Sequence, residues 1–335
     1  MATAPAEALA AARASGRKLP EFFIVGQPKS GTTALYEMLR SHAGIYMPEL
    51  KETRYFDREW HPGMQPITAD AGEHQAVGGA SDPHPNTLGQ YLALFAEART
   101  DQRAGEASPG YLRSPLTAAR IAELEPNARI IAIFREPASF LRSAHLQLLQ
   151  DHVETEKDFR KALAREESIA AEKPVLWYAR ERVEYVKQLR RYHDLFGRER
   201  VLVLIYDDFR ADNEGTIRRV LRFLDVDDAS PVSYTEANQT VLVRSPRMYQ
   251  LQRSLYLGSS PGARVAKAAI KALTPQRLRH EGLQALRRRV IFGKPEPPDE
   301  ALMLELRRRF KPEVAALGEY LDRDLVSLWG YDRIG

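Results

Sequence analysis

The segment Gly26-Gln-Pro-Lys-Ser-Gly-Thr-Thr33 restricts the fold of this chain more than any other part of its sequence. A short apolar run, Glu21-Phe-Phe-Ile-Val-Gly26, precedes it, and Thr32 to Ser41 follows it with apolar residues at helical spacing. Two glycines between a buried strand and a helix let backbone N–H groups close around an anion, and the helix N-terminus adds partial positive charge. This order of strand, loop and helix predicts the opening of a nucleotide-binding α/β fold.

The lysine of this loop is displaced from the position that ATPases use. In the usual loop, G-x-x-x-x-G-K-[ST], the lysine directly follows the second glycine. Here Thr32 follows Gly31, and the lysine lies before that glycine, at Lys29. We therefore expect the ammonium group to enter from the loop, and Thr32 and Thr33 to add hydroxyl donors. The alternative interpretation of the segment is an ordinary strand–helix turn.

The rest of the chain predicts a P-loop-type, mostly parallel sheet flanked by helices, because strand-like runs are separated by helix-length segments. Further strands are expected at Arg129–Phe134, at Val201–Tyr206 and, with a weaker pattern, at Gln102–Ala107. The main helices are expected at 137–150 and from about Trp177 to Phe196. No internal repeat and no second sheet is expected. The simplest organisation is a flexible tail, residues 1–19, and a single domain, residues 20–335.

Two regions depart from this alternation of strands and helices. Asp57–Asn86 is rich in glycine and proline and predicts a long irregular loop. Such loops in compact domains are usually functional or disordered. After about Ser245 the sequence predicts a helical C-terminal extension, interrupted near Ser259–Gly262 and Gly293–Pro298.

Composition excludes several classes of protein. Apolar residues make up 44% of the 335 residues, which is enough for a substantial core. No apolar run approaches the roughly 18 to 20 residues that span a bilayer, so an integral membrane protein is excluded. The absence of cysteine excludes disulfides, zinc ribbons, iron–sulfur clusters and thiol nucleophiles. The run Ala8–Ala12 is a poor signal-peptide core, so we expect a cytoplasmic protein.

The net charge of +4 is unevenly distributed along the chain. Between Arg244 and Lys311 there are 16 basic and 5 acidic residues. This excess suits an anionic partner, although solvated helix faces explain it equally well. No aromatic and basic recognition motif accompanies it, so nucleic acid is not an expected partner.

Pro28-Lys-Ser-Gly-Thr-Thr33 closely resembles the 5′-phosphosulfate loop of sulfotransferases that use 3′-phosphoadenylyl sulfate (PAPS). In that family, an arginine at the end of a later strand and a serine eight residues on bind the 3′-phosphate. Arg135 and Ser143 have these positions here. The geometry agrees with the resemblance, because an arginine leaving a buried strand offers a fork that fits a phosphate, and the expected helix carries Ser143 about two turns along.

A third match lies at Met47-Pro-Glu-Leu-Lys-Glu-Thr-Arg-Tyr-Phe-Asp57. Carbohydrate-type members of the family have a glutamate two or three residues before an aromatic pair in this place. The resemblance gives Glu52 this position and the role of general base. Tyr55-Phe56 is then the aromatic pair, and Arg54 stands where some relatives have histidine.

The segment Gly105-Glu-Ala-Ser-Pro-Gly-Tyr111 departs from two branches of the family. Aryl-type members have their catalytic histidine in the corresponding segment, and this one contains none. Some heparan-type relatives have a lysine where Ala107 stands. The resemblance therefore favours a carbohydrate, lipid or small-metabolite alcohol over a phenol, without naming a polysaccharide.

The resemblance implies in-line transfer of a sulfuryl group from PAPS to an acceptor hydroxyl or amine, with release of the 3′-phosphorylated product PAP and no required metal. Lys29 would neutralise charge on the bridging 5′-phosphate oxygen, and Glu52 would take the acceptor proton, provided that partial burial raises its pKa. The residues expected to hold the 5′-phosphate are Ser30, Gly31, Thr32 and Thr33. Relatives bind the outer 3′-phosphate with a basic loop near the C-terminus, for which Phe292-Gly-Lys-Pro295 makes Lys294 the candidate.

The acceptor is expected to be a small molecule or a glycan. Asp57–Asn86 and the helical C-terminal part are expected to line its pocket, because the core motifs are committed to PAPS. Candidate stacking surfaces are Trp60, Tyr91, Tyr111 and Trp177. A homo-oligomer is compatible with the sequence.

Four alternatives stay open from the sequence. A P-loop kinase or NTPase would use Asp207-Asp208 for magnesium, although the loop lysine is misplaced for ATP and these aspartates are expected to cap the next turn. A non-catalytic nucleotide-binding module is the second alternative, against which the intact candidate residues argue. Within the sulfotransferase hypothesis, His145 is the alternative base, and Arg135 has a structural salt bridge with Glu136 as its alternative role.

Overall fold

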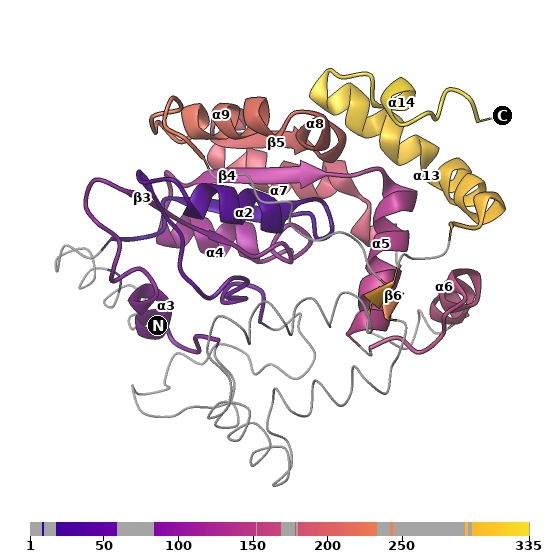
Figure 1. Ribbon diagram of the computed structural model, residues 1–335, viewed down its shortest axis with the longest axis horizontal. Coiled ribbons are helices and arrows are strands. Elements are labelled where there is room, and N and C mark those ends of the chain that lie inside the picture. The colour runs from indigo at the N-terminus through magenta and orange to yellow at the C-terminus, as the bar shows by residue number, and fades with distance from the viewer. Residues whose placement is uncertain are drawn as a thin grey trace, which may run out of the picture.

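The computed structural model of the chain describes residues 18–58, 84–151, 153–168, 178, 180–232, 242–243, 292–293 and 297–334, together with Leu9. Its centre is a parallel five-stranded sheet with the strand order β2-β3-β1-β4-β5 (Figure 1). The strands are β1 (Phe22–Gly26), β2 (Ile45–Tyr46), β3 (Arg103–Ala107), β4 (Arg129–Phe134) and β5 (Val201–Ile205). The predicted α/β fold with a mostly parallel sheet is confirmed.

Both faces of the sheet are buried, which explains why its central strands are almost continuously apolar. Successive residues of a strand point to opposite faces. In β1, Phe23 and Val25 belong to one hydrophobic cluster, and Phe22 and Ile24 belong to the other. The strands β4 and β5 divide their apolar residues between the two clusters in the same way.

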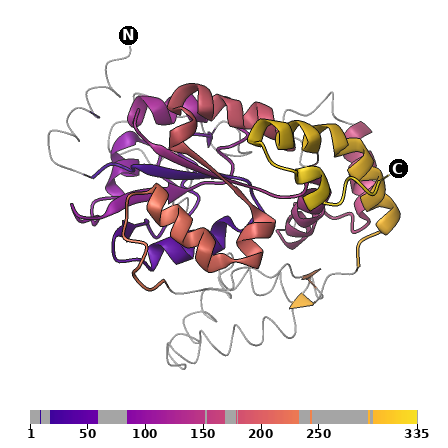
Figure 2. The same cartoon turned by 90° about the horizontal axis from the view of Figure 1, so that it is seen from above.

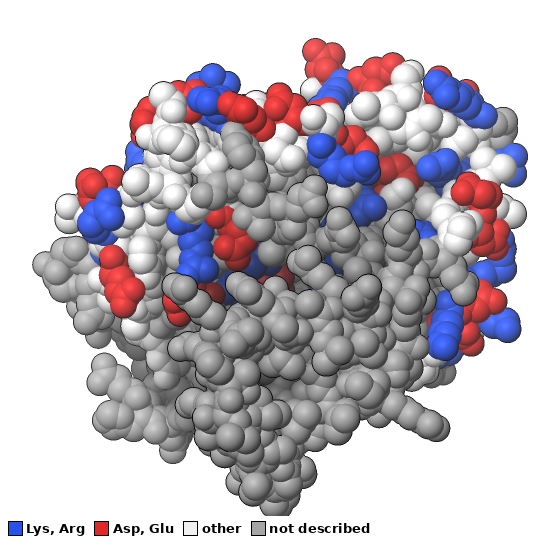
Figure 3. Space-filling view, in the orientation of Figure 1, with Lys and Arg blue, Asp and Glu red and all other residues white. Residues whose placement is uncertain are grey.

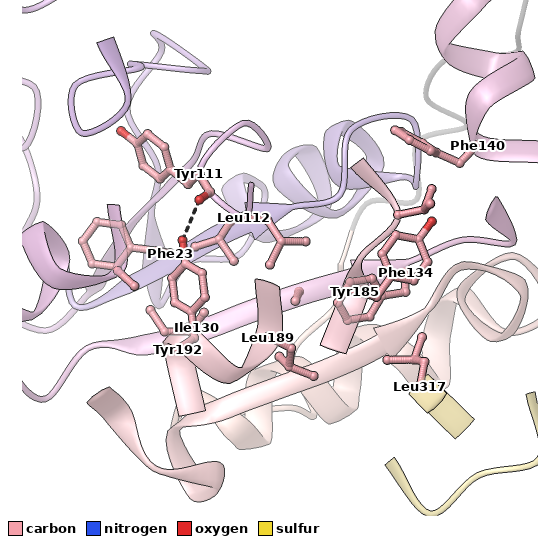
Figure 4. Close-up of a cluster of buried hydrophobic side chains, with 14 of the residues drawn as sticks. Phe23, Tyr111, Leu112, Ile130, Phe134, Phe140, Tyr185, Leu189, Tyr192 and Leu317 are labelled. Atoms are coloured by element: carbon pink, nitrogen blue, oxygen red, sulfur yellow. Dashed lines mark hydrogen bonds between the residues drawn. The ribbon is translucent and has the colours of Figure 1, made fainter. Parts of the chain in front are cut away.

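Helices cover the two faces, as Figure 2 shows from above. One face packs against α4 (Thr117–Leu124) and α7 (Tyr185–Phe196), and the other against α2 (Thr32–Arg40) and α9 (Asn213–Phe223). Figure 4 shows how α7 is fixed: the Tyr192 hydroxyl donates a hydrogen bond of 2.9 Å to the Tyr111 carbonyl. Helix α7 is thus fastened to the segment that follows β3.

The elements that follow the strands meet at the carboxyl edge of the sheet. There β1 leads into α2, β4 into α5 (Pro137–Gln150) and β5 into α8 (Tyr206–Ala211). In Figure 1 the arrow of β4 points towards α5 and α13 (Glu300–Leu321). Helix α13 packs against α5, α7 and α14 (Leu325–Leu328). The smaller elements are α3 (Leu88–Ala93), α6 (Phe159–Ser168) and 3₁₀ turns at Arg180–Arg182 and Arg198–Arg200.

Two short pairings were not expected from the sequence. The prediction of no second sheet was wrong, because β6 (Leu242–Val243) pairs with β7 (Phe292–Gly293) in an antiparallel two-stranded sheet. The strand β2 also joins the main sheet beside β3. Each of these strands is two residues long, which is too short for an alternating apolar pattern to reveal it.

The long helix expected from about Trp177 begins later, at Tyr185. Before that point the chain forms a 3₁₀ turn. There the carbonyl of Glu181 accepts a hydrogen bond from the Gln188 side chain, and the carbonyl of Arg182 accepts one from the Gln27 side chain. Side chains thus take carbonyls that a continuous helix would use itself.

Several predictions concern residues outside those described. They are the tail 1–19 apart from three of its residues, the loop 57–86 apart from its ends, and the chain from 244 to 291. The expected C-terminal helical character is confirmed at α13, which also carries the arginines at 307–309. Within the described ranges, no helix is both long and apolar enough to cross a bilayer. The described surface in Figure 3 carries interspersed acidic and basic side chains.

Candidate functional site

The glycine-containing loop runs from β1 directly into α2. Gly31 precedes the helix with a φ of 88°, a left-handed conformation that glycine adopts without strain. No side chain of the described residues caps this helix, so its first backbone N–H groups stay available for an anion. Ser30 and Thr32 are buried at this turn, and Thr33 is partly buried. The loop therefore has the predicted form of an anion cradle.

Lys29 reaches helix α5 from within the loop. Its Nζ donates a hydrogen bond of 2.8 Å to Gln147 Oε1, and Gln147 Nε2 donates in turn to the carboxylate of Asp151. Burial lowers the pKa of Lys29, and the charge of Arg135 lowers it further, whereas Asp151 and Glu52 raise it. The ammonium group therefore lies within electrostatic reach of both the Arg135 guanidinium and the Glu52 carboxylate.

Arg135 leaves β4 and contacts the loop. Its guanidinium donates a hydrogen bond of 2.8 Å to the Lys29 carbonyl and lies over the Tyr206 ring, 4.7 Å from the ring centroid. Burial lowers the pKa of Arg135. The alternative salt bridge with Glu136 is not formed; Glu136 instead caps α5 by accepting hydrogen bonds from its first backbone N–H groups.

Ser143 lies farther along α5 and is 4% exposed. Its hydroxyl oxygen has no hydrogen-bond partner among the described residues. A buried polar atom without a partner costs free energy, which a bound ligand or an ordered water would recover. Arg142 precedes Ser143; burial lowers its pKa, and Arg135 lowers it further.

Lys29 and Arg135 bring two positive charges together at the loop. Among the described residues, the hydrogen bonds of the Lys29 and Arg135 side chains go to an amide and a carbonyl, and neither side chain forms a salt bridge. Arg135 lowers the pKa values of both Lys29 and Arg142, so its charge repels each of these two cations. Partly buried cations that repel one another are stabilised when an anion joins them. The residues present therefore fit a ligand with phosphate groups.

Glu52 lies at the same edge of the sheet, beside the end of β3. Its backbone N–H donates a hydrogen bond of 3.0 Å to the Ala107 carbonyl, and β3 pairs with β1, which carries the loop. Its carboxylate pairs with Lys51 at 2.9 Å and with Arg54 at 3.4 Å, and its side chain is 39% exposed. Both ion pairs form within the charged run Lys51-Glu52-Thr53-Arg54, which in the sequence is also compatible with a surface charge cluster, and the role of Glu52 as the base stays a prediction.

The pKa of Glu52 moves in the direction opposite to the one expected. Burial raises it, but the charges and hydrogen bonds of Lys51 and Arg54 lower it more, so the net pKa is below the ordinary value of 4.5. The expected net rise of the Glu52 pKa was therefore wrong, although burial does act in that direction. At neutral pH Glu52 is ionised, which is the state that a general base requires.

His145, the alternative base, lies in the core between α5 and α6. It is 2% exposed; its Nδ1 is 2.8 Å from the Tyr178 hydroxyl, and its Nε2 is 3.2 Å from the Lys157 carbonyl. Burial lowers its pKa. Both ring nitrogens are hydrogen-bonded within the fold, which argues against His145 as the base.

The aromatic residues expected to stack on an acceptor have other roles where they are described. Tyr91 and Tyr111 are fully buried, and the Tyr91 ring stacks on Tyr55 with 4.5 Å between the centroids. These two side chains belong to the hydrophobic core, where both rings contact the Phe56 ring. Trp60 and Trp177 lie outside the described residues.

Asp207 and Asp208 lie in the first turn of α8, where negative charge suits the helix dipole, and do not cap a later turn as expected. The C-terminal segment binds both. Asp208 forms a salt bridge of 2.7 Å with Arg323, and Asp207 accepts a hydrogen bond of 2.9 Å from Trp329 Nε1. These partners give the aspartates a structural role, which removes the main support for the kinase hypothesis.

Sequence reasoning missed Gln147, Asp151 and Tyr206. The signal for the first two was their spacing, because Gln147 and Asp151 follow Ser143 at successive intervals of four residues along α5. Tyr206 comes directly after β5, where the strand end meets Arg135. The expected 3′-phosphate ligand Lys294 lies outside the described residues. In the described part of the chain, no group of acidic and histidine side chains is arranged to hold a metal ion.

Comparison with known proteins identifies the family. The model of the sulfotransferase family matches residues 20–230, and the chain belongs to this family. Mouse carbohydrate sulfotransferase 15 is 24% identical over 274 residues, 69% of this chain and 47% of the relative. Mouse heparan sulfate glucosamine 3-O-sulfotransferase 3B1 is 26% identical over 211 residues, 63% of this chain and 47% of the relative. The chain thus spans about half the length of these relatives.

A solved bacterial structure resembles the chain along almost its whole length. It is a sulfotransferase from Alicyclobacillus acidocaldarius, with 28% identity and a TM-score of 0.62. The match covers 92% of this chain and 98% of that one. The family expected from Lys29, Arg135 and Ser143 is therefore confirmed, together with its fold.

Proposed function

We propose that the protein transfers a sulfuryl group from PAPS to an acceptor hydroxyl or amine. The observation that carries this proposal is a pair of cations at the loop: Lys29 and Arg135 meet there without a salt-bridge partner among the described residues. The Ser143 hydroxyl on α5 is buried and has no hydrogen-bond partner among those residues either. PAPS has a phosphate for each of two such subsites. The 5′-phosphosulfate would lie on the loop 26–33, and the 3′-phosphate would lie between Arg135 and Ser143.

The reaction breaks the bond between sulfur and the bridging 5′-phosphate oxygen and forms a bond between sulfur and the acceptor oxygen or nitrogen. The electron pair of the broken bond stays on PAP, where Lys29 stabilises the developing charge. Glu52 accepts the proton that the acceptor loses. Positioning and charge stabilisation supply most of the rate enhancement in such transfers, and the residues named here are suited to both.

For the acceptor we propose a carbohydrate or a small-metabolite alcohol. A carboxylate base such as Glu52 suits an alcohol, and the family relatives include enzymes named for carbohydrate and heparan sulfate substrates. A screen with radiolabelled PAPS over an extract of the native host would test this proposal. Labelling of sugars or aliphatic alcohols is expected, and efficient transfer to simple phenols alone would contradict it.

Binding of PAP is the most direct test of the cofactor site. At about 100 times its dissociation constant, PAP should stabilise the protein by about 2.7 kcal/mol, because only the folded state binds it. For a domain of this size, we expect the melting temperature to rise by roughly 5 °C. Calorimetry should detect PAP binding without magnesium. Binding of ATP with magnesium, and not of PAP, would instead favour a kinase.

Substitutions in the 3′-phosphate subsite should separate binding from stability. Arg135→Ala is expected to weaken PAP binding by about 10- to 100-fold, because it removes a charge-assisted hydrogen bond. Ser143→Ala should weaken it by about 10-fold and leave the melting temperature of the free protein unchanged or higher, since the hydroxyl has no hydrogen-bond partner in the part of the chain that the structure describes. Arg99→Ala, at an exposed salt bridge, is the control. Equal PAP affinity in all three variants would contradict the assignment.

A further inference from the structure

Glu106 is a buried carboxyl group without a part in the proposed mechanism. It lies near the end of β3, is 1% exposed and is paired in the sheet with Phe23 of β1. Its Oε2 accepts a hydrogen bond of 2.6 Å from the Thr53 hydroxyl, and its Oε1 has no hydrogen-bond partner among the described residues. Thr53 directly follows Glu52, so a single hydrogen bond connects the buried carboxyl group to the segment that carries the candidate base.

The segment 52–56 is attached to the segment 106–111 by its backbone N–H groups. Glu52 donates to the Ala107 carbonyl at 3.0 Å, and Arg54 donates to the Ser108 hydroxyl at 3.3 Å. Phe56 donates to the Tyr111 hydroxyl at 3.4 Å. Residues 106–111 therefore form a clamp for the chain around Glu52.

The clamp holds a backbone conformation that would not persist by itself. Glu52 and Arg54 have φ values of 61° and 54°, in the left-handed region that residues with a Cβ rarely occupy. Such conformations are retained where surrounding contacts fix them, and they are common at functional sites. The hydrogen bonds that fix the left-handed conformation lie on both sides of Thr53, the residue between Glu52 and Arg54.

The hydrogen bonds of the clamp have a direction. The Thr53 hydroxyl accepts from the Tyr55 N–H at 3.4 Å and is 3.0 Å from the Tyr111 hydroxyl. Its own proton goes to Glu106 at 2.6 Å. Because Tyr111 in turn accepts from the N–H of Phe56, these hydrogen bonds all run towards Glu106, which is the final acceptor of the network.

We propose that Glu106 is a positioning residue for sulfuryl transfer: as the final acceptor, it fixes the left-handed segment that carries Glu52, and its ionised form fixes it best. An ionised carboxylate accepts a shorter and stronger hydrogen bond than a neutral acid does. Loss of the charge would loosen Thr53 and, with it, the position of Glu52. This inference rests on the proposed function, in which Glu52 is the base.

The surroundings of Glu106 place its titration near neutral pH. Burial raises its pKa to about 7, against the lowering effect of the hydrogen bond from Thr53 and of the nearby Tyr111 hydroxyl. The charge of Asp57 raises it, and the hydroxyl of Tyr91 lowers it. Asp57 also faces Arg113, whose pKa burial lowers and the charge of Asp57 partly restores. Glu106 is thus mostly protonated in weak acid and mostly ionised in weak base, and the clamp should tighten as the pH rises through 7.

Glu106→Gln tests this role, because glutamine keeps the size of the side chain and cannot ionise. With wild-type protein, kcat should rise as the pH increases through about 7. In the variant, kcat should be flat over this range and about 10-fold lower at about pH 8, with the KM for PAPS unchanged. Glu123→Gln, at an exposed position of α4, is the control for the loss of charge. A variant with the wild-type kcat and pH profile would overturn the proposal.

Glu106→Gln should raise the stability of the fold at about pH 8 although it lowers kcat. A carboxyl group whose pKa is raised by folding stabilises the fold most at low pH, and this contribution is lost as the pH rises from its unfolded value to about 7. Glu106→Gln should therefore melt at a higher temperature than the wild type at about pH 8 while being slower. A variant that was slower only because it was damaged would melt at a lower temperature, and this outcome would count against the proposal.

Thr53 provides a second test if Glu106→Gln fails to fold. Thr53→Val removes the hydroxyl that Glu106 binds, whereas Thr53→Ser retains it. We expect a loss of kcat in Thr53→Val that Thr53→Ser largely rescues. Equal kcat in these two variants would overturn the proposal, since the hydroxyl would then have no positioning effect.

Hydrogen exchange separates this inference from the proposed function. The backbone amides at 52–56 should exchange faster in Thr53→Val and Glu106→Gln than in the wild type, whether or not the acceptor is known. If wild-type protein transfers no sulfuryl group but shows this exchange pattern, the proposed function fails and the clamp stands. Unchanged exchange in both variants would overturn the clamp while leaving the function intact.

Discussion

Replacing Lys29 with alanine should lower turnover by about 10²- to 10³-fold while reducing PAP affinity by less than about 10-fold. The reason is that the ammonium group interacts most strongly with the bridging oxygen as its bond to sulfur breaks, so the transition state loses more than the bound product does. Single-turnover transfer from radiolabelled PAPS gives the rate, and calorimetry with PAP gives the affinity.

The loop itself should tolerate this change. Lys29 has a φ of 61°, and alanine has the same Cβ, so the substitution adds no backbone strain that lysine did not already have. Lys187→Ala is the matched control, because that lysine is exposed on α7 and pairs only with Glu184 among the described residues. Unchanged turnover in Lys29→Ala would remove its proposed role, and an equal loss in Lys187→Ala would indicate a general defect.

The parts of the site that could be predicted from the sequence are those fixed by local patterns. A buried strand, a glycine loop and a helix follow one another within a short stretch, so the conformation around Lys29 depends on neighbours in the sequence. The same is true of Arg135 and Ser143, because the end of β4 and the regular rise of α5 set their separation. The parallel sheet followed from apolar runs separated by helix-length segments.

The features that could not be predicted depend on contacts between distant segments. The pKa of Glu52 is lowered because the left-handed turns at Glu52 and Arg54 bring Lys51 and Arg54 to the same carboxylate. No pattern in the sequence indicates those turns. Tyr111 appeared suited to stacking on an acceptor, but its position under the segment 52–56 makes it a hydrogen-bonding part of the core.

The roles of His145 and Glu106 could not be predicted from the sequence either, because distant segments of the chain determine the surroundings of both side chains. His145 on α5 was a candidate base, but the Tyr178 hydroxyl and the Lys157 carbonyl, which both lie outside α5, occupy its two ring nitrogens. No sequence pattern indicates a role for Glu106, because it is a single glutamate at the end of a weakly predicted strand. Only the fold shows that it is buried and directed at Thr53.

Replacing Glu52 with glutamine should lower transfer by about 10²- to 10⁴-fold, because glutamine keeps the shape of the side chain but cannot accept the acceptor's proton. PAP affinity should be retained. The pKa of Glu52 lies below 4.5, so its carboxylate is lost only as the pH falls through that lowered value. The part of the pH profile that depends on Glu52 should therefore be level through the neutral range and fall only in strong acid.

The pH profile thus distinguishes the two glutamates. A rise in kcat near pH 7 belongs to Glu106, and it should vanish in Glu106→Gln while the fall in strong acid is kept.

Glu49→Gln is the matched control for Glu52→Gln, since Glu49 precedes it on the same segment and its side chain is 94% exposed. Full activity in Glu52→Gln would assign the proton to another group, and loss of PAP binding in that variant would mean that Glu52 supports the cofactor site instead. Normal PAP binding with slow transfer is the result that identifies Glu52 as the base.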